Sequence, residues 1–227
     1  PALPAFVVGA GTRPRRRVRL VRRTARRIGI ALLALLALLA LTLGLFLLPP
    51  ITHLLLGVAG SAEALDVDHA VAASLSDALV RDLLTGGNFD APLNAAPLLS
   101  ASERSHLVDV GSLFRVLMAA GALAVAALIA LYRRKRRWFF QGLHDGALLL
   151  GAGAAAVGGA FALAFDATFT FAHELLFPAG NWMFNPATDR LVQLYPMSFW
   201  VWTAMSFCAV LVGAATIGFL IARGRRR

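Results

Sequence analysis

The stretch IGIALLALLALLALTLGLFLL, residues 28–48, decides the fold because 21 consecutive positions carry no charge. An α-helix of about 20 apolar residues spans the roughly 30 Å hydrocarbon core of a bilayer. Three further apolar stretches follow, at about 112–132, 147–165 and 199–222. Of the 227 residues, 59% are hydrophobic and 15% charged, whereas soluble domains average about 25% charged. We therefore predict an all-α membrane protein with a four-helix transmembrane bundle.

The basic residues predict how this bundle is oriented. Nine arginines lie between Arg13 and Arg27, five basic residues at 133–137 and four at 223–227. Each cluster borders an apolar stretch, and such clusters are retained on the cytoplasmic side. Both termini are therefore expected in the cytoplasm. The two outer segments, 49–111 and 166–198, hold eleven of the twelve acidic residues.

The expected order of segments follows from these boundaries. It is a basic cytoplasmic arm (1–27), a first span (28–48), an extracytoplasmic helical segment (49–111), a second span (112–132), a basic cytoplasmic loop (133–146), a third span (147–165), an extracytoplasmic loop (166–198), a fourth span (199–222) and a basic cytoplasmic tail (223–227). The first span is too long for a signal peptide and is expected to be retained. Because the sequence starts at Pro1 without Met, we expect part of the natural N-terminus to be missing.

The first outer segment is expected to form a small helical extracytoplasmic cap. Apolar residues recur at helical spacing over Asp66–Leu84, which predicts an amphipathic helix. The glycines of Thr85–Asn88 favour its end, and Pro92–Leu99 is expected to be a loop. Ser100 and Glu103 have the spacing of a capping box, so a new helix should begin there and continue into the second span.

Composition also bears on packing and on partners. The third span is rich in small residues that allow close helix contact, which predicts a central position in the bundle; its glycines are Gly151, Gly153, Gly158 and Gly159. The single cysteine, Cys208, lies in an apolar stretch and cannot form a disulfide within the chain. The net charge is +10, and most of the basic residues lie in clusters without interleaved aromatic residues on which bases could stack. We therefore expect membrane lipids rather than nucleic acid as partners.

Two histidines are candidates for acid–base chemistry. His106 and Asp109 would share one helix face, where the carboxylate could orient the imidazole. The alternative is a solvated helix start in which Glu103 serves only as a cap. His173 lies among Phe165, Phe169 and Phe177, which are spaced in multiples of four residues, and a histidine in an apolar stripe near lipid is costly unless it has partners or a function.

The residues offer no covalent nucleophile and no clear metal motif. His173-Glu174 lacks a second histidine four positions after the first, and no Gly-x-Ser-x-Gly is present. A zinc site built from His106, Asp109, His173 and Glu174 stays as an alternative. The main expectation is catalysis by the histidines without cofactor or metal.

Four motifs in order resemble the lipoprotein intramolecular transacylase family of bacterial integral membrane proteins. They are Glu103-x-x-His106-x-x-Asp109-Val110, Phe171-Ala-His173-x-Leu175-x-Phe177, Asn181-Trp182-x-Phe184-x4-Asp189-x-Leu191 and Tyr195-Pro196-x-x-Phe199-Trp200. The resemblance implies an enzyme in the bacterial plasma membrane with an extracytoplasmic active face. It would move an acyl chain from the glycerol sn-2 ester of a diacylglyceryl lipoprotein to the amine of the N-terminal cysteine.

The resemblance also implies roles for single residues. His106 and His173 would be catalytic, one as base and the other as acid or oxyanion donor. Supporting or substrate-contacting residues would be Glu103, Asp109, Glu174, Asn181, Trp182, Asp189 and Tyr195. Leu107 and Gly111 depart from the family pattern, which leaves another acylated lipid open as the substrate. We expect a monomer. The competing functions are a metal-dependent membrane hydrolase and a non-enzymatic protein whose outer loops bind a partner.

Overall fold

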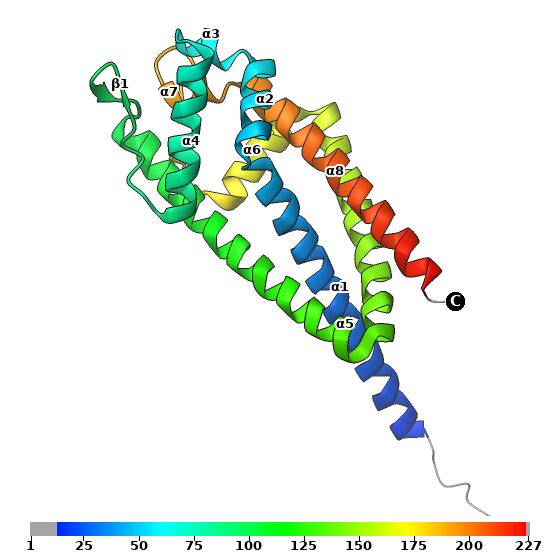
Figure 1. Ribbon diagram of the computed structural model, residues 1–227. Helices are drawn as coiled ribbons and strands as arrows, with labels where there is room; N and C mark the ends of the chain where they lie inside the picture. Colours follow the sequence, from blue (N-terminus) through cyan, green and yellow to red (C-terminus); the bar gives the residue numbers. More distant parts are fainter. Residues whose placement is uncertain (1–12, 226–227) are drawn as a thin grey trace, which may run out of the picture.

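The structure, a computed structural model, describes residues 13–225 and is mostly helical (Figure 1). The elements are α1 (Arg13–Phe46), α2 (Pro49–Ala59), α3 (Ser61–Leu65), α4 (His69–Thr85), β1 (Pro92–Leu93), β2 (Ala96–Pro97), α5 (Ala101–Leu163), α6 (Phe165–Leu176), α7 (Arg190–Leu194) and α8 (Met197–Gly224). Positions 1–12 of the expected basic arm and 226–227 of the tail lie outside the described residues.

The longest element, α5, reverses direction at one residue. Only Lys135 has non-helical backbone angles, with φ −143° and ψ 54°, and Figure 1 shows two arms that meet at this point. The predicted loop 133–146 is therefore helical on both sides of Lys135. Packing explains the difference, because Phe140 and Gly142 are buried beyond the reversal. We call the end of the bundle that contains Lys135 the basic end.

Helix α1 lies between the two arms of α5, where glycines allow close contact. A side chain at Gly121 on the first arm would collide with Ala40, and one at Gly142 on the second arm with Ile30. The predicted third span lies in the second arm and packs against both α1 and α8, through Leu150 and Ala154. Within it, Gly151 and Gly158 face α8, whereas Gly153 and Gly159 have no neighbour within 4 Å.

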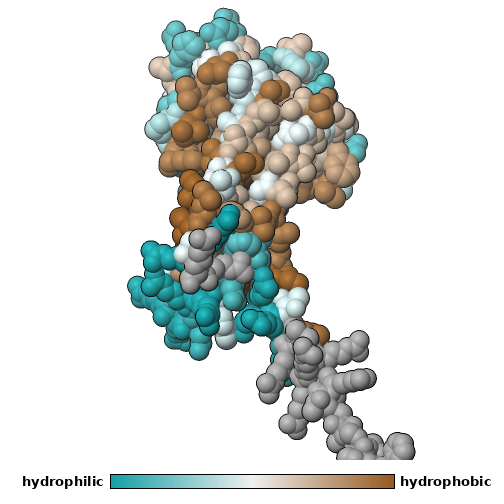
Figure 2. All heavy atoms as spheres, turned by 90° about the vertical axis from the view of Figure 1, so that its right-hand side faces the viewer, coloured by the Kyte–Doolittle hydropathy of each residue, from teal (hydrophilic) through white to brown (hydrophobic). Residues whose placement is uncertain are grey.

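The described residues include three helices that are long and apolar enough to cross a membrane. They contain Val21–Phe46, Ala101–Leu163 and Met197–Gly224. The 63 residues of α5 sum to about 95 Å of helix, and the reversal at Lys135 divides this length into two arms that are each long enough to cross a bilayer. Figure 2 shows hydrophobic side chains across the middle of one face and hydrophilic side chains toward both ends. This distribution is typical of a membrane protein.

The segment 49–100, which we call the cap, forms a compact helical unit at the end opposite Lys135 (Figure 1). Its amphipathic helix α4 begins at His69, later than predicted, and ends as expected before Gly86, whose φ is +79°. The predicted loop 92–99 contains the two-residue strands β1 and β2, which pair antiparallel. The cap core includes Leu56, Leu65, Leu75, Leu79, Phe89, Leu98 and Leu99, and Leu107 of α5 with Leu191 and Leu194 of α7 pack into it.

The second predicted outer loop, 166–198, also contains helix. Helix α6 follows α5 after a break at Ala164, and α7 precedes α8. The four-residue recurrence of Phe165, Phe169 and His173 places their rings on one side of α6, where neighbouring rings are 5.7 and 4.0 Å apart. These contacts within the helix explain why the segment is ordered as a helix.

Candidate active site

His106 lies in the second turn of α5, where the capping box fixes the helix start. Ser100 Oγ accepts from the backbone N–H of Glu103, and Glu103 Oε2 accepts from that of Ser100 at 2.7 Å, as predicted. The His106 side chain is buried, with 7% of its residue surface exposed. Its Nδ1 is enclosed and has no well-aligned hydrogen-bond partner among the described residues. Burial lowers the pKa of His106, the neighbouring His173 lowers it further, and the side chain of Asn181 opposes this shift.

Glu103 links the start of α5 to α7. Besides the cap, its Oε1 accepts a hydrogen bond of 2.7 Å from the backbone N–H of Leu191. Both carboxylate oxygens are thus occupied by backbone donors, and the residue is only 2% exposed. Glu103 therefore positions the helix that carries His106. Its carboxylate is bonded to the backbone and is not a reacting group.

His173 lies in the last turn of α6, and its surroundings define its tautomer. Nδ1 lies 2.9 Å from the carbonyl oxygen of Phe169. A carbonyl can only accept, so Nδ1 carries the proton and Nε2 of the neutral ring holds a free lone pair. Burial lowers the pKa of His173 below 6.5, and the hydrogen bond to Phe169 raises it by less. The ring is therefore neutral at pH 7.

The two imidazoles lie next to each other although they are 67 positions apart. Their ring centroids are 6.1 Å apart and their planes differ by 31°. Phe177 contacts both rings, at 4.9 Å from His106 and 5.7 Å from His173. Trp182 lies 5.1 Å from His173. Aromatic side chains thus surround two close imidazoles, and such a site disfavours the state in which both rings are charged.

Asn181 connects Asp109 to this pair. Its Nδ2 donates a hydrogen bond of 2.8 Å to Asp109 Oδ2, while its Oδ1 is buried without a partner in the described structure. We expected Asp109 to contact His106 directly. No such hydrogen bond is present among the described side chains, and Asp109 is exposed. The carboxylate therefore holds the carboxamide of Asn181, whose free oxygen is available to a ring N–H or to substrate.

Residues 81–200 match the family described as "Lipoprotein intramolecular transacylase Lit". The chain belongs to this family. The match covers more than half of the sequence and includes both histidines of the pair. It confirms the resemblance drawn from the four motifs and the prediction of a membrane enzyme of the transacylase type.

Solved structures of the lipoprotein intramolecular transacylase Lit from Bacillus cereus share the fold. One has 21% sequence identity and a TM-score of 0.71, and covers 88% of this chain and 94% of the other. Two variants of that protein with a single histidine mutation have TM-scores of 0.63 and 0.64, with 22% and 19% identity. They cover 91% of this chain and 95% and 94% of theirs. No curated protein sequence matches significantly.

The remaining predicted site residues lie within the transacylase match but outside the imidazole pair. The hydroxyl groups of Tyr195 and Ser76 lie 2.9 Å apart, and burial raises the pKa of Tyr195 to about 12. Asp189 Oδ2 accepts from the backbone N–H of Asn185 and shapes the turn before α7. Glu174 is exposed. Tyr195 and Asp189 therefore have structural contacts.

Two rings in the site have no role in the predicted set. Phe177 and Phe184 both pack edge-on against His106, with centroids at 4.9 and 5.7 Å. The spacing of Phe165, Phe169 and Phe177 indicates an aromatic stripe, but it does not indicate contact with His106. These two rings supply the apolar surroundings of the His106 imidazole.

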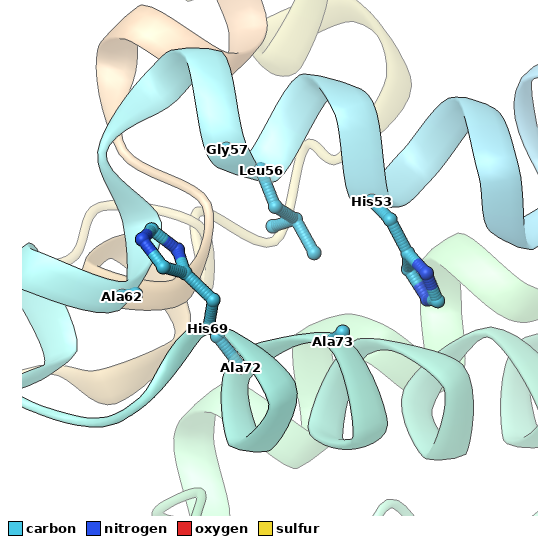
Figure 3. A pocket seen from close by; sticks show the side chains of 7 residues that line it. All are labelled: His53, Leu56, Gly57, Ala62, His69, Ala72 and Ala73. Atoms are coloured by element: carbon cyan, nitrogen blue, oxygen red, sulfur yellow. The ribbon is translucent and has the colours of Figure 1, made fainter.

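The described residues contain no group of three or more His, Cys, Asp or Glu side chains that could hold a metal ion. The geometry therefore does not favour the zinc site considered for His106, Asp109, His173 and Glu174. A cavity of about 200 Å³ in the cap lies apart from this site, between α2 and α4 (Figure 3). His53 and His69 lie at its two ends, and His53 Nε2 is 2.9 Å from Asp77.

Proposed function

We propose that this chain transfers an acyl chain within a diacylglyceryl lipoprotein, from the glycerol sn-2 ester to the α-amine of the N-terminal cysteine. The observation that carries the proposal is the close approach of His106 and His173, 6.1 Å between ring centroids, in a chain of the transacylase family. Both rings come from one chain, so a monomer is sufficient. The product is a lyso-form lipoprotein.

His173 acts as the base in this reaction. The Nε2 lone pair takes a proton from the amine as the amine nitrogen attacks the ester carbonyl. When the tetrahedral intermediate collapses, the bond between the carbonyl carbon and the glycerol oxygen breaks. His173 returns its proton to that oxygen, so the ring ends the cycle neutral and an amide has replaced the ester.

His106 stabilises the charge that develops on the carbonyl oxygen. In the tautomer that carries the ring proton on Nε2, His106 donates this N–H to the oxyanion. The aromatic rings around the pair exclude water and strengthen this interaction. The site needs no serine or cysteine nucleophile, because the substrate supplies its own amine, and intramolecular delivery provides a large advantage in proximity.

The proposed topology places this chemistry on the extracytoplasmic side of the bacterial plasma membrane. The two arms of α5 would cross separately, which gives four crossings with α1 and α8. The basic residues at 133–137 and 223–227 then lie in the cytoplasm with both termini. The cap and the imidazole pair lie at the opposite end.

A synthetic diacylated lipopeptide tests the activity. Incubation of the lipopeptide with purified protein should move one acyl chain to the amine, and tandem mass spectrometry of the N-terminal fragment detects the new amide. A lipopeptide with an acetylated amine is the matched control and should not react. Release of free fatty acid from both peptides would instead identify a hydrolase, and no reaction with either peptide would contradict the proposal.

A further inference from the structure

A second cavity, of about 580 Å³, lies at the basic end of the bundle. Its walls come from α1, both arms of α5 and α8, and most of its lining is apolar, including Leu38, Leu128 and Phe139. Ligand-binding cavities in proteins commonly have volumes of about 300–1,000 Å³. The cavity is therefore large enough for a ligand, and its lining favours hydrocarbon.

The charged side chains that line this cavity are both arginines. Arg136 comes from α5, just after the reversal, and Arg225 from the end of α8. The Arg136 guanidinium lies 5.3 Å from the Tyr132 ring centroid and 5.8 Å from that of Phe140. Such contacts restrict the side chain while it stays exposed. Hydrocarbon walls thus adjoin two positive charges.

We propose that this cavity binds one phospholipid with an anionic headgroup. One acyl chain lies against the apolar walls, and the phosphate and headgroup contact Arg136 and Arg225. A guanidinium suits this contact because it donates two parallel hydrogen bonds to a phosphate. A free anion would not contact the apolar walls, and a peptide helix would not need the two guanidinium groups.

The cavity is separate from the imidazole pair. His106 and Lys135 lie on the same helical arm, 29 positions apart, which corresponds to about 45 Å along the helix axis. A lipid held by Arg136 therefore cannot place its ester at His106. The proposed lipid is a bound partner and not the acyl donor.

Native mass spectrometry of the detergent-solubilised protein tests the proposal. Phosphatidylglycerol and phosphatidylcholine with identical acyl chains are added at matched concentrations. Phosphatidylglycerol should be retained preferentially as one bound molecule. The double variant Arg136→Gln/Arg225→Gln should lose about 25-fold in affinity, because each arginine contributes about fivefold. The variant Arg133→Gln/Arg134→Gln removes the same charge outside the cavity lining and should keep the preference.

A second pair of variants tests the apolar half of the site. Leu41 lines the cavity and is 61% exposed, so Leu41→Trp fills space without disrupting the core. It should reduce lipid retention, whereas Leu32→Trp, on an exposed α1 position outside the lining, should not. Equal retention of the two lipids, or equal losses in the cavity and control variants, would overturn the proposal.

Discussion

The carboxylate of Glu103 accepts a hydrogen bond from the backbone N–H of Leu191, 88 positions later in the chain. The same carboxylate accepts from Ser100, so one buried side chain joins the start of α5 to the start of α7. Helix α7 packs through Leu191 and Leu194 into the cap core. The position of His106, one turn after Glu103, therefore depends on a contact that involves no substrate.

Glu103→Ala should reduce the free energy of unfolding by about 3 kcal/mol, because it leaves the buried backbone N–H of Leu191 and the partly buried one of Ser100 without their acceptor. Unfolding in mixed micelles measures this loss. Glu174→Ala removes an exposed carboxylate and serves as the control. Equal stability of the two variants would show that Glu103 has no structural role.

His106→Ala and His173→Ala should each reduce the acyl-migration rate at least about 100-fold, because general acid–base groups contribute that much or more. Expression and folding should be unaffected. His53→Ala changes a cap histidine and should retain normal activity. If both site variants stay fully active, the catalytic assignment is wrong.

The rate should depend on the protonation of His173. Because burial lowers the pKa of His173 below 6.5, the neutral base already predominates at pH 7. The rate should therefore be constant near neutral pH and fall as the pH drops through this lowered pKa. The measurement is a pH–rate profile with a lipopeptide whose amine has a pKa below the tested pH range, so that titration of the amine does not change the rate. A rate that does not fall in acid contradicts the assignment of His173 as base.

The same lowered pKa makes a prediction about stability. Between the lowered pKa of His173 and 6.5, the unfolded chain binds more protons than the folded chain. The contribution of His173 to stability is therefore complete above about pH 6.5 and decreases in more acidic solution. His173→Gln should reduce this pH dependence, as unfolding measured between about pH 5 and pH 8 would reveal.

Asp109 and Asn181 should act as one unit. Asn181→Ala and Asp109→Ala should each lower the turnover number by about tenfold. This factor corresponds to about 1–2 kcal/mol, a typical coupling energy between two side chains joined by a hydrogen bond. The double variant should be no slower than Asn181→Ala, because Asp109 acts through the 2.8 Å hydrogen bond to Asn181. Additive losses in this double-mutant cycle would mean that the two residues act independently.

Gly146→Ala should destabilise the bundle by about 1–3 kcal/mol. The added methyl group would lie 2.7 Å from the carbonyl oxygen of Ala31 on α1, and backbone cannot easily move away. Gly153→Ala on the same arm has no neighbour within 4 Å and should be neutral or slightly stabilising. Comparison of the two unfolding midpoints measures the close contact between α1 and α5.

Much of the fold follows from local patterns. The apolar stretches predict the long helices, and Ser100 with Glu103 predicts where α5 begins. The helical structure of 136–146 could not be predicted in this way. Its basic residues favour a loop, but the burial of Phe140 and the close contact of Gly142 with Ile30 of α1 are tertiary effects that outweigh local composition.

The site was less accessible to prediction from the residues alone. The spacing of His106 and Asp109 predicts a common helix face, but it is equally compatible with a solvated helix start that has no catalytic role. Only the family resemblance indicated that His106 and His173 act together. The bond between Asn181 and Asp109 depends on how the chain after α6 folds back across 72 positions. No local pattern encodes that return.

The position of α1 between the arms of α5 has a consequence for synthesis. This helix leaves the ribosome before any other described element, and both surfaces that later cover it belong to one helical hairpin. The two arms that contact α1 are therefore synthesised one directly after the other. The ion pair of Arg27 with Asp145, 2.9 Å between Nη2 and Oδ2, can form only once the second arm has been inserted. The hairpin thus closes around a helix that was made before it, and α8, the last helix of the chain, then packs against the second arm.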